Sequence, residues 1–248
     1  MRRARTAAAV SAGIGLAYAL AIRPWFLAWG ATAEEVGAAL PGDEIVPTPR
    51  TACTRAIAIA ADPEDVWPWL AQMGQGRGGM YSYDWLENLL GYDIHNVDRV
   101  VPELQRIEVG DPVRLGPQGA KVDTTLEVAI ADRGRALVLR APGSRSEAFA
   151  AGMGFPSWAF VIEPVGPRNV RLIARWRCDF EPTLSGHLMW KYGVEPVHFV
   201  MERRMLTVIK KLAERLNRER LSHSTPDSRP EAESRFANTS QGAWAWPA

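Results

Sequence analysis

Two consecutive patterns in residues 170–220 constrain the fold of this chain more than any other part of the sequence. From position 170 to 180, apolar side chains such as Trp176 alternate with charged ones such as Arg175 and Arg177. A period of two with one charged face is typical of a strand in an antiparallel sheet that buries one side and leaves the other in water. The sequence therefore predicts a strand whose arginines lie in solvent.

A long amphipathic helix is predicted directly after this strand. Pro196 suits a first helical turn, and the helical pattern continues to about Arg220, which gives a length of roughly 37 Å. A helix of this length crosses a whole sheet, so its apolar stripe is expected to face the strands. The stripe consists of Val194, Val197, Met201, Met205, Val208 and Leu212.

Shorter patterns of the same two kinds occupy the preceding part of the chain. Residues 51–60 alternate as a strand, and Asp62-Pro63 then supplies an N-cap and a first-turn proline for a helix that ends at the glycines from Gly74. A second short helix is expected over residues 82–90. We therefore predict one α+β domain over residues 51–220. Its other strands are expected at residues 113–115, 122–130, 136–141 and 158–162.

The first 29 residues combine a basic start with an apolar helix. Three arginines precede residues 6–22, which carry no charge, and Trp25, Phe26 and Trp29 follow. Seventeen residues give roughly 25 Å, the short end of a bilayer crossing, and the aromatic group is typical of a membrane interface. We expect a membrane anchor with the domain outside the cytoplasm. There are two alternatives: a cleaved signal peptide of a secreted protein, and an apolar helix packed on a cytoplasmic domain.

Two further segments flank the domain. Residues 30–50 hold a short helical pattern and then several prolines and glycines, which indicates a linker that wraps onto the domain. Residues 221–248 are rich in Ser, Pro, Asn, Glu and Ala without apolar periodicity, so they predict a disordered tail. The oligomeric state is left open by these patterns.

Charge and composition restrict the classes of partner. The net charge is +1, which gives no electrostatic reason to expect a nucleic-acid partner. The chain has two cysteines, whereas a zinc site needs three or four ligands, so we expect no metal. We expect no cofactor either. The glycine run at residues 74–79 follows a helix and lacks Gly-Lys-Ser/Thr, which favours a flexible loop over a phosphate-binding one.

The order of the predicted elements is that of the helix-grip fold. Residues 57–74 (IAIAADPEDVWPWLAQMG) resemble the opening of the SRPBCC superfamily, the START-like or Bet v 1-like proteins that include polyketide cyclases/dehydrases. Residues 23–32, 74–105 and 195–206 are similar to a bacterial branch of that superfamily whose members are mostly uncharacterised. The resemblance implies a curved antiparallel sheet that grips a long C-terminal helix around an apolar cavity, and it brings no catalytic residue with it.

The resemblance also bears on the cysteines. In the helix-grip fold the first and last strands are antiparallel neighbours, and the alternation of side chains places Cys53 and Cys178 on the inner face. A disulfide would suit an exported domain, but cross-strand geometry is often poor for one. Buried free thiols are therefore the favoured prediction.

Aromatic and methionine side chains are candidates for the lining of the expected cavity, because both adapt to bulky apolar ligands. For each residue alone, ordinary core packing is the alternative. The candidate ligand-binding residues are Met73, Tyr81, Tyr83, Trp85, Trp158, Phe160, Trp176, His198, Met201 and Met205.

Few polar residues are candidates for chemistry in such a cavity. His198 and His95 could transfer a proton, and Tyr81 and Tyr83 could orient a carbonyl. Asp93, His95 and Asp98 are close in sequence and suggest a metal or acid/base group, although surface hydrogen bonding is the simpler interpretation.

Three functions remain open from the sequence. The favoured one is binding or carriage of a hydrophobic small molecule, lipid or polyketide-like, by a membrane-tethered protein. A polyketide cyclase/dehydratase-type enzyme and a structural or stress-related envelope protein are the alternatives. Phe199 and Leu206 lie opposite the apolar stripe of the closing helix. They are expected either to pack under the N-terminal segment or to mark a self-association or membrane-facing patch.

Overall fold

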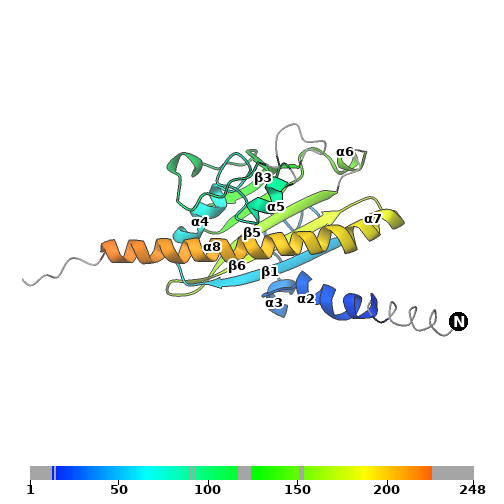
Figure 1. The fold of residues 1–248 in the computed structure, drawn as a ribbon, viewed down its shortest axis with the longest axis horizontal. Coiled ribbons are helices and arrows are strands. Elements are labelled where there is room, and N and C mark those ends of the chain that lie inside the picture. The colour runs from blue at the N-terminus through cyan, green and yellow to red at the C-terminus, as the bar shows by residue number, and fades with distance from the viewer. Residues whose placement is uncertain are drawn as a thin grey trace, which may run out of the picture.

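The computed structural model describes residues 13, 15–89, 91, 93–116, 124–150 and 154–224. Six antiparallel strands form one sheet in the order β1-β6-β5-β4-β3-β2, and a long helix crosses one of its faces (Figure 1). The arrangement fits the predicted α+β helix-grip fold. The predicted tail from residue 225 onwards lies outside the described residues, as do residues 6–12 and 14 of the apolar segment. The strands are β1 (Thr51–Ile59), β2 (Pro112–Arg114), β3 (Thr125–Asp132), β4 (Ala136–Arg140), β5 (Phe155–Gly166) and β6 (Asn169–Asp179).

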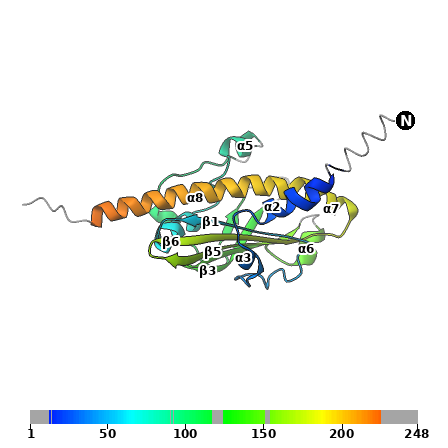
Figure 2. The ribbon, with the colours of Figure 1, turned by 90° about the horizontal axis from the view of Figure 1, so that it is seen from below.

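Helices surround this sheet on both faces (Figures 1 and 2). As predicted, Asp62 caps the helix α4 (Pro63–Ala71), where its side chain and that of Asp65 form a reciprocal capping box. The helices that precede β5 are η1 (Tyr18–Ile22), α2 (Arg23–Leu27), α3 (Ala33–Gly37), α4 (Pro63–Ala71), α5 (Asp84–Leu89), η2 (Pro102–Leu104) and α6 (Arg145–Ala150). Those that follow β6 are α7 (Leu184–Met189), η3 (Trp190–Val194) and α8 (Glu195–Ser224).

The closing helix begins earlier than the sequence predicts. Helical structure is continuous from Leu184 through the π-helical turn η3 into α8, whereas Pro196 suggested a start at that residue. Proline has no N–H to donate, and the wider π turn before Pro196 accommodates it inside the helix. The continuous helical segment of α7, η3 and α8 is called the closing rod below. The carbonyl of Lys191, five residues before Pro196, instead accepts a hydrogen bond of 2.6 Å from the Tyr18 hydroxyl.

The buried face of α8 is rotated from the predicted stripe. Val197 is 61% exposed, so its assignment to the inner face is wrong. The sheet, the helix that follows β1 (residues 63–71) and the N-terminal segment all pack against α8, and together they select a partly different set of positions. Met205 and Leu212 of the predicted stripe are buried, and so are Glu195, Phe199, Glu202, Leu206, Ile209, Ala213 and Asn217.

The N-terminal segment packs against the start of α8. The ring of Phe26 stacks on that of Phe199 with centroids 5.5 Å apart, and Trp25 meets the same ring edge-on at 5.3 Å. Of the two roles expected for Phe199, packing under the N-terminal segment is confirmed, and Leu206 is part of the main core. Within the described residues, none of the helices has both the length and the apolar character needed to cross a bilayer.

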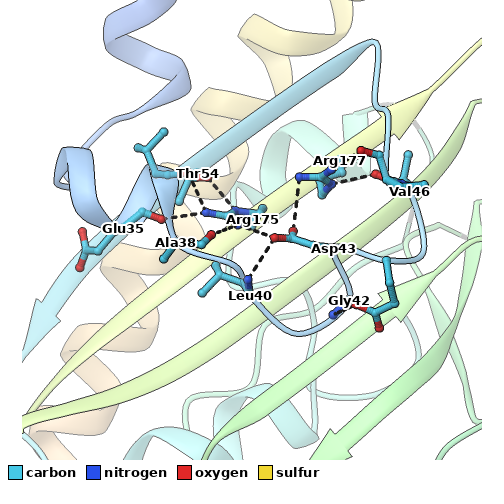
Figure 3. A network of polar contacts seen from close by, with 12 residues as sticks. Glu35, Ala38, Leu40, Gly42, Asp43, Val46, Thr54, Arg175 and Arg177 are labelled. Carbon is cyan, nitrogen blue, oxygen red and sulfur yellow. Dashed lines mark hydrogen bonds and ion pairs between the residues drawn. The ribbon is translucent and has the colours of Figure 1, made fainter.

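The outer face of β6 is covered, contrary to the prediction of a solvated row of arginines. Residues 30–46 run across this face, and Arg175 is buried beneath them (Figure 3). Its guanidinium donates to Asp43 and to the carbonyl of Ala38, each at 2.7 Å, and also to Thr54 at 2.9 Å. Two more backbone carbonyls, those of Glu35 and Val36, complete its set of acceptors. Burial of this arginine is acceptable because its charge and its donors are satisfied.

Substitution of Arg175 by lysine is expected to lower the free energy of unfolding by about 2 kcal/mol, because an ammonium group cannot replace the planar fork of donors. Denaturant unfolding measures this loss. Hydrogen exchange should show faster exchange in residues 35–46. The matched control is Arg135→Lys in the exposed β3–β4 turn, which should change neither measurement. Equal behaviour of the two variants would contradict a locking role for Arg175.

Candidate functional site

A charged residue lies on the inner face of β1, where the sequence pattern places apolar ones. Arg55 shares this face with Cys53 and Ile59, and its side chain is fully buried. Its Nε donates to the carbonyl of Phe26 at 2.8 Å, and its Nη1 donates to Glu202 Oε2 at 2.5 Å. Arg55 therefore joins three elements far apart in the sequence: β1, the N-terminal segment and α8.

Glu202 is the buried counter-charge of this arginine. Its other carboxylate oxygen, Oε1, accepts a hydrogen bond of 2.7 Å from the indole N–H of Trp158 on β5. Neither the Arg55 nor the Glu202 side chain is exposed to solvent. A buried ion pair of this kind contributes little net stability compared with apolar packing, so its presence needs an explanation other than stability. Buried charged groups of this sort cluster at functional sites.

His198, one turn before Glu202 on α8, completes the cluster. Its Nδ1 lies 3.0 Å from Arg55 Nη1. Because a guanidinium can only donate, Nδ1 must be the acceptor, and the neutral imidazole therefore carries its proton on Nε2. Burial lowers the pKa of His198 to about 4, and the Arg55 guanidinium adds to that effect while Glu202 opposes it. At neutral pH the ring is uncharged and presents an N–H donor.

Two donors of this cluster are left without acceptors. Within the described residues, neither Arg55 Nη2 nor His198 Nε2 has a hydrogen-bond partner, although both atoms are buried. Both residues line a cavity of about 10 Å³ beneath the start of α8, enough for about one water molecule. Its other lining residues are Leu27, Thr51, Cys53, Trp176, Trp190, Val194 and Glu195.

Trp190 also lines a larger cleft on the surface. The cleft has a volume of about 270 Å³ and is lined by seven residues between positions 180 and 190, Phe180 and Met189 among them. Trp190 contributes to both hollows, and its ring stacks on Phe180 with centroids 5.2 Å apart. It lies in the π turn η3, a distortion that is frequent at functional sites. The two hollows thus have Trp190 in common among their lining residues.

The same cluster contains three potential metal ligands. Donor atoms of Cys53, His198 and Glu202 all lie within 4.8 Å of one another. However, the Arg55 guanidinium already bonds to two of these residues, and a divalent cation there would stand beside a buried positive charge. Burial also raises the pKa of Cys53 to about 12, so the thiolate that a metal needs is disfavoured. The arrangement fits an ion pair better than a metal centre.

The structure brings together part of the predicted lining set. Trp176 and His198 line the cavity, and their rings are 4.7 Å apart. Trp158 lies against both, at 5.5 Å from each ring, and contacts Phe160 at 4.8 Å. Cys53 and Cys178 are buried free thiols, as predicted, on the neighbouring strands β1 and β6.

Several other predicted residues lie elsewhere. Met73, Tyr81 and Met205 are packed into the main core. The interior at these positions is therefore filled, where an apolar cavity was expected. The Tyr81 hydroxyl accepts a hydrogen bond of 2.9 Å from Gln72. Met201 is partly buried, and its backbone carbonyl accepts a hydrogen bond from Ser82.

Three candidates lie at or near the surface. Trp85 is 65% exposed on α5, so its placement in the interior is wrong. Tyr83 is partly buried and has the guanidinium of Arg204 over its ring. His95 is exposed and pairs with Asp93 at 3.1 Å, which matches the surface interpretation of that group.

Sequence reasoning missed Arg55, Glu202 and Trp190. A signal was present for the first two. Arg55 occupies an inward position in the alternation of residues 51–60, and Glu202 follows His198 by four residues, on the same side of the helix. A charge of each sign at inward positions of two elements indicates a buried pair. Trp190 precedes the predicted start of the helix, so no pattern marked it.

Comparisons with known proteins find resemblance in structure alone. The chain matches no protein-family model and no curated protein. Solved structures similar to it include the KanY protein (ms6282), at 12% identity and a TM-score of 0.42, over 67% of this chain and 99% of that one. A truncated norcoclaurine synthase from Thalictrum flavum matches at 12% identity and a TM-score of 0.36, over 65% and 92% of the two chains. Protein MLL2253 from Mesorhizobium loti matches at 16% and 0.36, over 66% and 98%.

All three of these likenesses have sequence identities of 16% or less. At TM-scores below 0.5 they carry no argument about what the chain binds or does. The residues around the cavity are therefore the best indication of what this protein does.

Proposed function

We propose that this protein binds a mostly apolar small molecule through one oxygen acceptor, at the buried N–H donors of Arg55 and His198. The observation that carries the proposal is that both donors belong to residues lining one aromatic-lined cavity, and that neither has a hydrogen-bond acceptor among the described residues. A buried donor without an acceptor costs free energy, and a carbonyl, hydroxyl or carboxylate oxygen between the two would recover it.

Electrostatic balance favours a neutral ligand with a polar end. Arg55 is paired with Glu202, and Arg23 is paired with Glu195 at 2.7 Å at the cavity wall, so the charges around the cavity cancel. Trp176 and Trp190 supply apolar surface beside the donors. A carbonyl or hydroxyl oxygen on an apolar body, as in a lipid or polyketide-like molecule, matches this combination.

Access to the donors requires Trp190 to turn aside. That movement joins the cavity of about 10 Å³ to the surface cleft of about 270 Å³, whose volume suits the apolar body of the ligand. The oxygen then reaches the donors while the remainder of the molecule occupies the cleft.

Binding is better supported than proton-transfer catalysis. An effective general base has a pKa near the working pH, whereas that of His198 is about 4 and its Nδ1 lone pair is occupied by Arg55. The cyclase/dehydratase alternative lacks a strong base at this cavity. A purely structural role, in which one water molecule satisfies both donors, is the outcome that would replace the proposal.

A matched pair of probes tests the proposal by isothermal titration of the full chain. The ketone 2-acetylnaphthalene should bind about tenfold more tightly than 2-ethylnaphthalene, because it alone offers an acceptor to the two donors. The variant His198→Phe removes one donor and should abolish the preference, while His95→Phe, at an exposed site, should keep it. Equal affinity for the two probes would contradict donor-based recognition. Absence of binding, together with native mass spectra free of co-purified small molecules, would favour the structural role.

A further inference from the structure

Exposed apolar side chains are concentrated at one end of the molecule. Among the described residues, fifteen large hydrophobic side chains are exposed, and ten of them belong to the N-terminal segment or to the first part of the closing rod. Their exposed fractions range from 46% to 77%. These ten residues, called the end surface below, are Leu16, Leu20, Ile22, Trp25, Leu184, Leu188, Met189, Tyr192, Val197 and Val200.

The two helical segments that carry the end surface are held side by side (Figure 2). The Tyr18 ring stacks on that of Tyr192 with centroids 5.2 Å apart. Next along the pair, Arg23 forms two hydrogen bonds with Glu195, of 2.7 and 2.8 Å. Trp25 then packs against Phe199. The exposed apolar residues therefore lie on two adjacent helical segments, about 170 positions apart in the sequence.

We infer that the end surface lies in the interfacial layer of an anionic lipid bilayer. Isolated exposed apolar residues are ordinary, but a cluster on adjacent helices marks an interaction site. Trp25 and Tyr192 combine an apolar ring with a polar atom, as residues at membrane interfaces do. In the sequence, Leu16, Leu20 and Ile22 of the end surface belong to the uncharged stretch of residues 6–22.

The distribution of charge favours lipid over an ordinary protein partner. The first acidic residue of the whole chain is Glu34, whereas Arg2, Arg3 and Arg5 precede the apolar segment. On the closing rod, residues 184–200 contain one acidic residue, Glu195, which is buried and neutralised by Arg23. Basic residues without opposing acids attract anionic headgroups, and an apolar helix pair lying in the interface supplies the rest of the affinity.

The position of the surface cleft adds a consequence that rests on the proposed binding function. Met189 belongs both to the end surface and to the lining of the cleft outside Trp190. A protein docked through the end surface thus opens the cleft toward the bilayer, where an apolar ligand is dissolved. Docking itself does not depend on whether any ligand binds, and its test is independent of the cavity.

A fluorophore attached to the end surface tests the inference in the full chain. The variant Leu188→Cys, labelled with an NBD dye, should show a shift of emission to shorter wavelength when vesicles of phosphatidylcholine and phosphatidylglycerol are added. Brominated lipid in the same vesicles should quench that emission. Both native cysteines are buried, so the introduced thiol is labelled selectively under native conditions. The matched control is Val165→Cys, an exposed position at the β5–β6 turn, at the opposite end of the sheet from α7.

Each alternative has a distinct result. An unchanged spectrum at position 188, or equal shifts at positions 188 and 165, would overturn the inference. A shift that appears without vesicles as the protein concentration rises would assign the end surface to a second copy of the chain, which also overturns it. A shift confined to position 188 and dependent on vesicles supports lipid docking, whatever the outcome of the naphthalene titrations.

Discussion

The variant Arg55→Met is expected to lose about 3–5 kcal/mol of unfolding free energy, because it leaves the Glu202 carboxylate buried without a counter-charge. The Phe26 carbonyl also loses its donor, so part of the loss comes from the contact with the N-terminal segment. Urea denaturation followed by circular dichroism measures the effect, provided that the slope of the transition is unchanged.

The double variant Arg55→Met/Glu202→Met is the decisive control. Removing both charges together leaves no uncompensated ion, and apolar side chains of similar length refill the space, so most of the lost stability should return. A double variant no more stable than Arg55→Met would show that the pair is not the coupled unit described above. A single variant as stable as the wild type would contradict the burial of Glu202.

The recovered double variant also separates stability from function. It folds without the Arg55 donor and should therefore show a smaller preference for 2-acetylnaphthalene over 2-ethylnaphthalene than the wild type does. If the ion pair served the fold alone, the double variant would bind the two probes with the same affinities as the wild type. This result would confine the role of the pair to the fold.

Acidification from pH 7 to pH 4 is expected to remove roughly 3 kcal/mol of stability through His198 alone. In the unfolded chain this histidine takes up a proton near its ordinary pKa of about 6.5, whereas in the folded protein its pKa is about 4. Between those values the unfolded state binds more protons, so the stability present above pH 6.5 declines as the pH falls and is lost below pH 4.

A difference measurement isolates this contribution from that of the carboxylates, which titrate in the same range. The variant His198→Asn keeps an acceptor near the position of Nδ1 but does not titrate, so its stability should fall less steeply between pH 6.5 and 4. The exposed His95 and its variant His95→Asn provide the control, with the slope of the wild type. An unchanged slope in His198→Asn would contradict the neutral, buried state of this ring.

Local patterns in the sequence were sufficient for most of the secondary structure. The alternation in residues 51–60 and 170–180 and the long helical periodicity before Arg220 correspond to β1, β6 and α8. These predictions succeeded because strand and helix periods depend on neighbouring residues. The start of the closing rod at Leu184 was missed, since the π turn before Pro196 has no simple signature in the sequence.

The candidate site was predicted less completely. His198, Trp176 and the buried thiol Cys53 followed from inward positions on their own elements. Arg55 and Glu202 were at inward positions too, but their pairing joins residues 147 positions apart, and no local period encodes such a contact. The cavity therefore turned out to be small and flanked by a buried ion pair, where a large apolar one was expected.

The sequence by itself determined most of the strands, the main part of the long helix and the inward-facing positions of β1 and β6. Tertiary structure alone decided which positions of those elements are covered. Arg175 is buried because residues 30–46 supply it with acceptors, and Val197 is exposed because the sheet and the N-terminal segment both pack on other sides of α8. The physical reason is that periodicity sets the direction of a side chain relative to its own backbone, whereas burial depends on which distant segment covers it.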